Sequence, residues 1–495
     1  MNFPLKFEKG GWTRIGAFIL LLILVVGAFL RTYTSLQQTE FANGWDAYYY
    51  LIQIKAILTE GHMHSRDYSL IYPLLLCVKW FCSDYILAYK VTVSLVSGLF
   101  IVSLFIGAYQ MAYGQKLLVG LLAASIGLFS PAALFVESQF LKNFLGMVLF
   151  IGFIASLPKG KWYVVIALFL LTFLTHRLTG MMASVLLVFH FANKKHWKWL
   201  LAGGMLAVTA SLLVPGVLHL LDLGRFSGEL QWIPQFAPWS FLHYYGFEKL
   251  HWSWYVDLSI ACMGFIIAVF FGVKDFRKQP LKNLKLSLAL ICLLLCFPFF
   301  IFNAEGPALR LFFAFLLLAP LFTAFFAPRI PSWILILLMG VFSVSSLWSR
   351  RAYDPQQFDP PYALYDVVTR NALHYPVCYG RPLVIAHKAL AEYFTFTTGK
   401  DALPWQADPE IPMDSIVRIS ADIERWEFKT YLDTGEFKQV VPLGLNYSLL
   451  PESLWQTFIR KVPPDDTCLM QRVRSWQNPW RVRPAFIQRN RPAEP

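Results

Sequence analysis

Two acidic residues lie in short polar segments between long apolar runs, where a carboxylate could act on a hydroxyl group. Asp46 follows the turn signal Asn43-Gly44 and precedes a run with helical spacing, Ala47 to Glu60. It could cap that helix, and it could also take a proton from an acceptor hydroxyl as a general base. Both roles can hold at once. Glu137, the only acid in ESQFLKNFLG, is the second candidate catalytic residue.

Four basic residues in similar segments could bind a phosphate group. They are Lys142 in ESQFLKNFLG, His176 and Arg177 in LTHRLTG, and Arg310 in NAEGPALRLFF. A guanidinium matches the geometry of a phosphate, and charged groups at a membrane boundary are costly unless they are solvated or paired. Structural alternatives stay open: a snorkelling Lys142, a loop role for the His-Arg pair, and an Arg310–Glu305 ion pair.

The composition places these residues in a membrane protein. Of the 495 residues, 57% are hydrophobic and only 15% are charged, and the mean hydropathy is +0.50. So much apolar surface exceeds what one soluble core can bury. The net charge of +13 does not indicate nucleic-acid binding, because Lys and Arg are dispersed among apolar segments rather than gathered on one face.

Apolar runs near 20 residues predict about eleven transmembrane helices. The expected spans are 14–33, 85–110, 117–135, 141–157, 161–176, 179–192, 199–222, 255–273, 284–303, 308–327 and 330–348. Lysine and arginine concentrate in every second junction, as the positive-inside rule requires if the N-terminus is cytoplasmic. Residues 34–84 then form the first outer loop. Its short apolar segment 68–82, interrupted by Pro73, is expected to be re-entrant or interfacial.

The composition changes near Ser349, which divides the chain into a transmembrane domain, 1–348, and a soluble extracytoplasmic domain, 349–495. The soluble domain is expected to be small and α/β. Strands are expected at Pro382–Ala386 and Ile416–Ile419, and helices at Lys388–Phe394 and near Glu452–Val462. An Arg-rich tail follows, either solvated or in contact with anionic lipid. Cys378 and Cys468 are either free or joined by a disulfide.

Three features resemble the GT-C superfamily of membrane glycosyltransferases. A first span is followed by an outer loop that holds Asp46 and an interfacial helix. The run GQKLLVGLLAASIGLFSP with the following ESQFLKNFLG resembles the third span and second outer loop of oligosaccharyltransferase catalytic subunits. A soluble extracytoplasmic domain after a polytopic body fits the same architecture. The resemblance implies a polyprenyl-phosphate-linked sugar donor.

The chain departs from oligosaccharyltransferases at two places. Lys142 and Asn143 stand where those enzymes carry adjacent acidic metal ligands, and the soluble domain has no WWD-type motif. We therefore expect no asparagine-linked transfer and no obligatory divalent metal, with a side-chain cation neutralising the donor phosphate instead.

The expected function is sugar transfer to a lipid, glycan or protein acceptor at the outer face of the cell inner membrane. Its catalytic residues would be Asp46 and Glu137, and its phosphate ligands Lys142, His176, Arg177 and Arg310. A transporter or lipid flippase, or a non-catalytic scaffold of envelope assembly, would explain the spans without catalysis.

Overall fold

The computed structural model forms two compact units, each built from two stretches of the chain. Met1–Gly44 and Arg66–Phe358 make the helical unit; Trp45–Ser65 and Asp359–Pro495 make the second unit. The second unit thus combines most of the expected soluble domain with part of the first outer loop. The described residues are 11–65, 67, 69–158, 162–191, 252–276, 307–349, 359–360, 362–373, 383–386, 388–399, 402–404, 416–421, 426–431 and 440–442.

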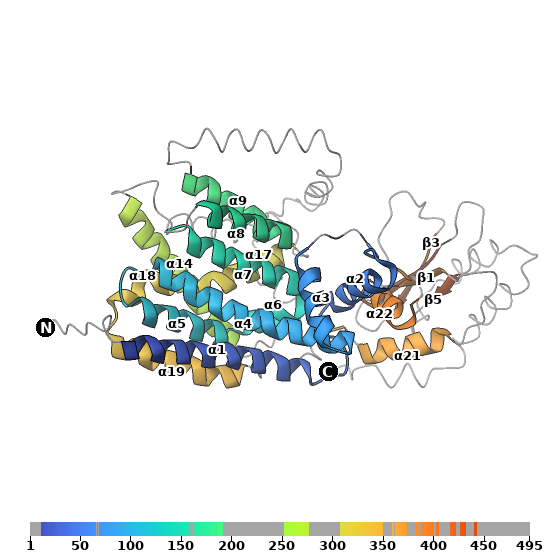
Figure 1. Ribbon diagram of the computed structural model, residues 1–495. Helices are drawn as coiled ribbons and strands as arrows, with labels where there is room; N and C mark the ends of the chain where they lie inside the picture. The colour runs from blue at the N-terminus through green and yellow to red at the C-terminus, as the bar shows by residue number, and fades with distance from the viewer. Residues whose placement is uncertain are drawn as a thin grey trace, which may run out of the picture. The chain divides into compact units, whose positions relative to one another are not determined.

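The helical unit is a bundle around α4, which packs against α1, α5 and α7 (Figure 1). Its helices are α1 (Gly11–Leu36), α3 (Ile71–Phe81), α4 (Tyr85–Met111), α5 (Lys116–Phe129), α6 (Pro131–Gln139), α7 (Leu141–Ser156), α8 (Trp162–Thr175), α9 (Arg177–Phe191), α14 (Trp252–Phe276), α17 (Pro307–Leu318) and α19 (Ser332–Ser349). Three short turns, η2 (Ala319–Phe322), α18 (Thr323–Phe326) and η3 (Ala327–Arg329), extend α17.

Four helical segments are long and apolar enough to cross a membrane: Arg14–Leu36, Tyr85–Met111, Trp252–Phe270 and Arg310–Arg329. The bent pair of α5 and α6 would be a fifth. The chain is therefore a mostly helical membrane protein. The expected spans within the described residues coincide with helices, but several are short and the span 117–135 is divided between α5 and α6. The spans 199–222 and 284–303 lie outside those residues, so the count of eleven stays a prediction. Segment 68–82 contains the short apolar helix α3.

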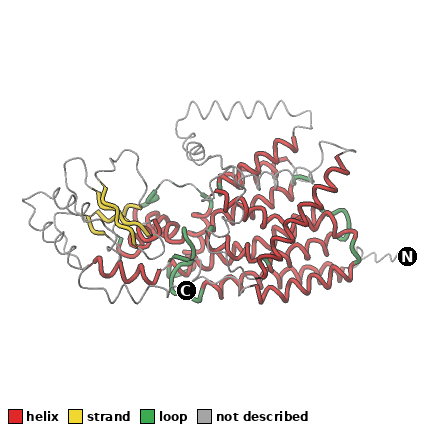
Figure 2. Tube along the Cα trace, turned by 180° about the vertical axis from the view of Figure 1, so that it is seen from behind, coloured by secondary structure: helices red, strands yellow, loops and turns green. Residues whose placement is uncertain are grey.

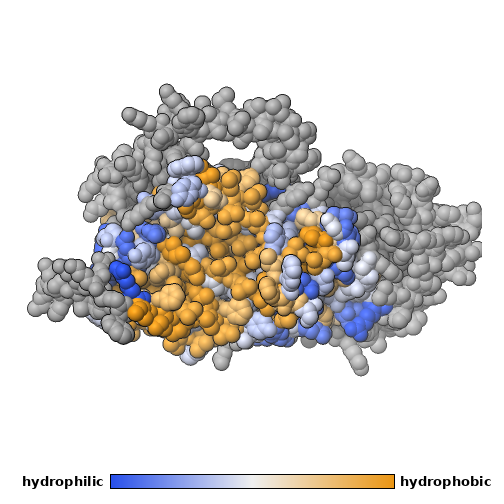
Figure 3. Space-filling model, in the orientation of Figure 1, coloured by the Kyte–Doolittle hydropathy of each residue, from blue (hydrophilic) through white to orange (hydrophobic). Residues whose placement is uncertain are grey.

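Apolar side chains cover much of the face of the helical unit seen in Figure 3. Large hydrophobic residues of α1, α8 and α19 are exposed, among them Phe18, Trp162 and Leu347. A soluble protein rarely exposes a contiguous apolar patch of this extent, whereas lipid tails solvate it without cost. This exposed apolar surface agrees with the high hydrophobic content of the sequence.

A sharp break separates α5 from α6, whose axes differ by 64°. Pro131 has no N–H with which to continue α5, but it suits the first position of a new helix. Ser130 caps α6 by accepting from the Ala133 amide, at 3.1 Å. The buried Asp257 of α14 accepts from the Ser130 hydroxyl at 2.7 Å and from the Ala132 amide at 3.3 Å. The Ala132 and Ala133 amides in the first turn of α6 are thus bonded inside the bundle.

In the second unit, α2 (Ala47–Glu60) has the bounds that the sequence predicts, and Gly61 ends it with φ 77°. It packs against α22 (Lys388–Thr398). The buried Tyr48 ring lies 4.8 to 5.4 Å from the rings of Tyr362, Tyr393 and Phe396. Burial raises the pKa of the Tyr393 phenol well above its ordinary value, so this phenol stays neutral.

The strands of the second unit lie together (Figure 2). Parallel pairing joins β2 (Ala402–Pro404), β1 (Leu383–Ala386) and β5 (Val440–Pro442) in that order. The pair β3 (Ile416–Ala421) and β4 (Trp426–Tyr431) is antiparallel. Two expected strands and the helix at 388–394 are present, as β1, β3 and α22. The expected helix near 452–462, the Arg-rich tail, Cys378 and Cys468 lie outside the described residues, and the α/β class of the whole domain stays a prediction.

Gly44 gives a test of how the first loop is anchored to the bundle. Its φ is 108°, and a Cβ there would lie 2.0 Å from the Ser138 carbonyl oxygen. Gly44→Ala should destabilise the protein by about 2 kcal/mol or more, from both backbone strain and the clash. Thermal unfolding in detergent measures this. Gly61→Ala is the matched control, because Gly61 also has positive φ but open space around it; equal losses for the two variants would contradict the close contact.

Candidate functional site

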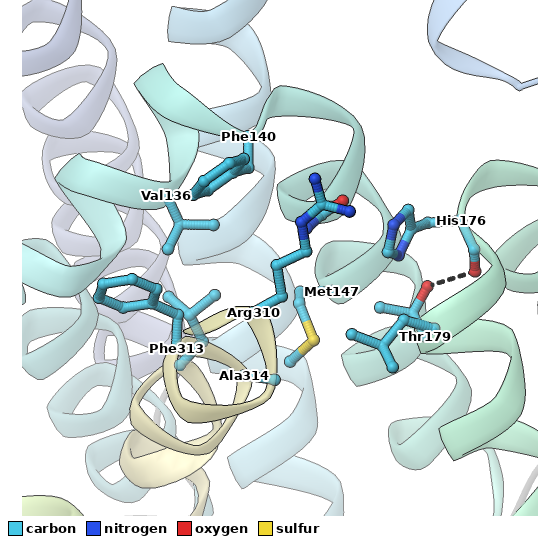
Figure 4. A pocket seen from close by; sticks show the side chains of 11 residues that line it. Val136, Phe140, Met147, His176, Thr179, Arg310, Phe313 and Ala314 are labelled. Atoms are coloured by element: carbon cyan, nitrogen blue, oxygen red, sulfur yellow. Dashed lines mark hydrogen bonds between the residues drawn. The ribbon is translucent and has the colours of Figure 1, made fainter. Parts of the chain in front are cut away.

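A pocket opens within the helical unit between the ends of α6, α7, α9 and α17 (Figure 4). The empty space at this site is about 300 Å³, a figure that includes open solvent. The lining residues are Val136, Phe140, Asn143, Met147, His176, Leu178, Thr179, Arg310, Phe313, Ala314 and Leu317. Most of them are apolar, and they surround a small number of polar groups.

Arg310 supplies the positive charge of this pocket. It lies one turn after Pro307, the first residue of α17, where the helix end adds further positive potential. Its guanidinium lies 5.3 Å from the centre of the Phe140 ring. Its Nε is buried and has no hydrogen-bond partner among the described residues. Glu305, the expected partner of Arg310, lies outside those residues.

His176 reaches the same pocket from the junction of α8 and α9. Its carbonyl oxygen accepts from the Gly180 amide at 2.9 Å and from the Thr179 hydroxyl at 2.9 Å. Gly146 of α7 allows the close approach, because a Cβ there would lie 2.5 Å from Thr179 Oγ1 and 2.9 Å from His176 Cβ. Figure 4 shows the imidazole and the Arg310 guanidinium on the same side of the pocket.

Lys142 forms an ion pair with Asp67, a carboxylate that was not among the candidate site residues. Its Nζ lies 2.5 Å from Asp67 Oδ1, and the Tyr72 hydroxyl donates to Asp67 Oδ2 at 2.5 Å. Two residues on, Ser69 donates to the Thr175 carbonyl at 2.7 Å, next to His176. Asp67 lies between the predicted helix and the short apolar segment, and no local pattern distinguishes it from an ordinary loop acid.

Glu137 lies in the interior of the bundle and does not line the pocket. It is fully buried, accepts a hydrogen bond of 2.5 Å from Thr32, and lies 3.5 Å from the Arg31 guanidinium. Arg31 also donates to the Leu128 carbonyl. The interaction joins α1 to α6. Arg31, inside the first expected span, and Asp257, inside the 255–273 span, could have been found from the sequence as ionisable residues within apolar runs.

Asp46 belongs to the second unit. It occupies the N-cap position of α2, and its carbonyl accepts from the Tyr50 amide at 3.2 Å, but its side chain makes no capping hydrogen bond. Chain connectivity keeps Asp46 within about 8 Å of Gly44.

Of the candidate residues, His176 and Arg310 line the pocket, whereas Lys142, Arg177 and Glu137 do not. A cation beside an aromatic ring, surrounded by apolar side chains, suits an anionic head group that carries an apolar chain. Among the described residues, no group of three or more His, Cys, Asp or Glu side chains could hold a metal ion. Independence from metal stays a prediction.

No protein-family profile matches the sequence, and no curated protein matches it. Among solved structures, the chain is similar to the archaeal oligosaccharyltransferase AglB from Archaeoglobus fulgidus, in complex with an inhibitory peptide and a dolichol-phosphate. The sequence identity is 10% and the TM-score is 0.43; the match covers 80% of this chain and 65% of the AglB chain. At this identity no residue role transfers from AglB.

The buried pair of Arg31 and Glu137 gives a test of the bundle interior. Glu137→Gln should lower the free energy of unfolding by about 3–5 kcal/mol, because the Arg31 charge loses its partner. Thermal unfolding in detergent measures the loss. The double variant Arg31→Leu, Glu137→Leu removes both charges and should lose much less. A double variant as unstable as Glu137→Gln would show that the two charges do not stabilise each other.

Proposed function

We propose that the protein is a membrane glycosyltransferase that binds a polyprenyl-phosphate-linked sugar and passes the sugar to an acceptor hydroxyl. The observation that carries this proposal is the pocket around Arg310. Its buried guanidinium nitrogen can donate a charge-assisted hydrogen bond to a phosphate oxygen. The surrounding apolar wall, from Val136 to Leu317, suits the first part of a prenyl chain.

His176 is the second phosphate ligand in this proposal, because it shares the pocket with Arg310. Both side chains would stabilise the charge that builds on the leaving phosphate during transfer. Arg177 follows His176 directly but does not line the pocket, and its role as a phosphate ligand stays a prediction.

Asp46 is proposed as the general base, on the strength of the sequence. Its carboxylate would take the proton of the acceptor hydroxyl. The acceptor oxygen then bonds to the anomeric carbon, and the bond from that carbon to the phosphate oxygen breaks. The lipid phosphate leaves with the electron pair. The acceptor, whether a lipid, a glycan or a protein, is not specified by this proposal.

A lipid transporter is the second candidate, and the break between α5 and α6 favours it. Discontinuous helices form the substrate sites of many secondary transporters. A transporter would use the Arg310 pocket to bind the same lipid, but it would leave the sugar on the lipid. Product analysis therefore separates the two functions, whereas lipid binding alone does not.

Arg310 and Arg329 provide a matched test of the phosphate site. They lie at opposite ends of one apolar segment, and each guanidinium stacks on an aromatic ring, Phe140 or Tyr113. Arg310→Gln should weaken binding of a polyprenyl phosphate to the purified protein by about 10- to 100-fold, since a charged hydrogen bond contributes about 1.5–3 kcal/mol. Arg329→Gln should change binding less than about twofold, because of its distance of roughly 30 Å. Equal effects of the two substitutions would refute the site.

Catalysis is tested by glycan and lipid mass spectrometry on cells that lack the protein. Complementation with the wild-type chain should restore a sugar-modified product, and Asp46→Asn at matched expression should not, because an amide cannot accept the proton. Full restoration by Asp46→Asn would leave Asp46 as a helix-terminal residue only. If no glycan changes in any strain, the transporter becomes the better explanation.

A further inference from the structure

We infer that the pocket selects a donor whose lipid is joined to the sugar through one phosphate rather than two, and that Asp67 sets this preference. The inference rests on the proposed function, since it names the class of donor for the same pocket. It follows from the charges that the described residues place in and around the pocket.

The pocket itself offers one fixed positive charge. Among its described lining residues, Arg310 is the only Lys or Arg, and none is an Asp or Glu. The guanidinium is always protonated. A sugar joined to a lipid through one phosphate is a phosphodiester with a single negative charge, whereas the corresponding diphosphate carries two. The fixed charge of the pocket therefore matches the monophosphate.

Lys142 would be the natural ligand for a second phosphate, because it lies one helical turn before Gly146, which packs against His176 and Thr179 of the pocket. Its charge is instead neutralised by Asp67, at 2.5 Å. Both side chains are largely buried, with 21% of Lys142 and 15% of Asp67 exposed. An ion pair with little solvent access is screened weakly, so Asp67 competes strongly with any anion for Lys142.

Asp67 is held at this place from two directions. The Tyr72 hydroxyl of α3 bonds its second carboxylate oxygen, and Ser69 ties the same segment to the Thr175 carbonyl, beside His176. A second phosphate group at Lys142 would meet the carboxylate of Asp67, and like charges at short range in a poorly solvated place repel strongly. Asp67 is thus a specificity-determining residue and does not itself bind the donor.

The test compares two probes of the same prenyl chain length: the methyl ester of polyprenyl phosphate and the methyl ester of polyprenyl diphosphate. Both are titrated into the purified full chain in nanodiscs of uncharged lipid. The wild type should bind the monophosphate ester about tenfold more tightly. Asp67→Asn should tighten diphosphate binding by about tenfold and change monophosphate binding less than twofold, because the amide no longer neutralises Lys142.

Lys142→Gln supplies the control. As a single substitution, Lys142→Gln should change the affinity for either probe less than twofold. In the double variant with Asp67→Asn, it should cancel the increase in affinity for the diphosphate ester. Tighter binding of the diphosphate by the wild type, or an equal effect of Asp67→Asn on both probes, would overturn the inference. The proposed function would survive either outcome if Arg310→Gln still weakens binding. Failure of the wild type to bind either probe would instead refute the proposed function.

Discussion

A charged group inside an apolar bundle must be paired, hydrogen-bonded or placed in a cavity, and this constraint organises the helical unit. Glu137 satisfies it with Arg31 and Thr32, and Asp257 satisfies it with the cap of α6. Lys142 satisfies it with Asp67. Arg310 satisfies this constraint in another way, because its guanidinium lies over the Phe140 ring and faces a pocket. Among these groups, Arg310 is the one whose surroundings leave room for an anion.

Helix α6 shows how such buried contacts position the pocket. Its first turn is held by Asp257, its last turn by the pair of Glu137 and Arg31, and Gly44 packs on the carbonyl of Ser138. Helix α6 gives Val136 to the pocket, and its C-cap residue gives Phe140. Glu137 therefore affects the site through the placement of its neighbours.

The residues on which the proposed function depends belong to different units. All lining residues of the pocket belong to the helical unit, whereas Asp46 begins the first helix of the second unit. The proposed roles of Arg310 and Asp46 can therefore be tested by separate substitutions. The aromatic core around Tyr48 links α2 to segments more than 300 residues later in the chain, so the predicted outer-loop helix folds with the C-terminal segments.

The sequence by itself determined the positions of most described apolar helices, because apolar length and charge placement are local properties that the bilayer imposes. It also determined the bounds of α2, from the Asn43-Gly44 turn and Gly61. It did not determine the break between α5 and α6. It could not determine which charges meet. Glu137 and Arg31 are far apart along the chain, as are Lys142 and Asp67, and only tertiary packing brings their side chains within range. That packing separated Arg310 and His176, which line a pocket, from Lys142, whose charge is paired with Asp67.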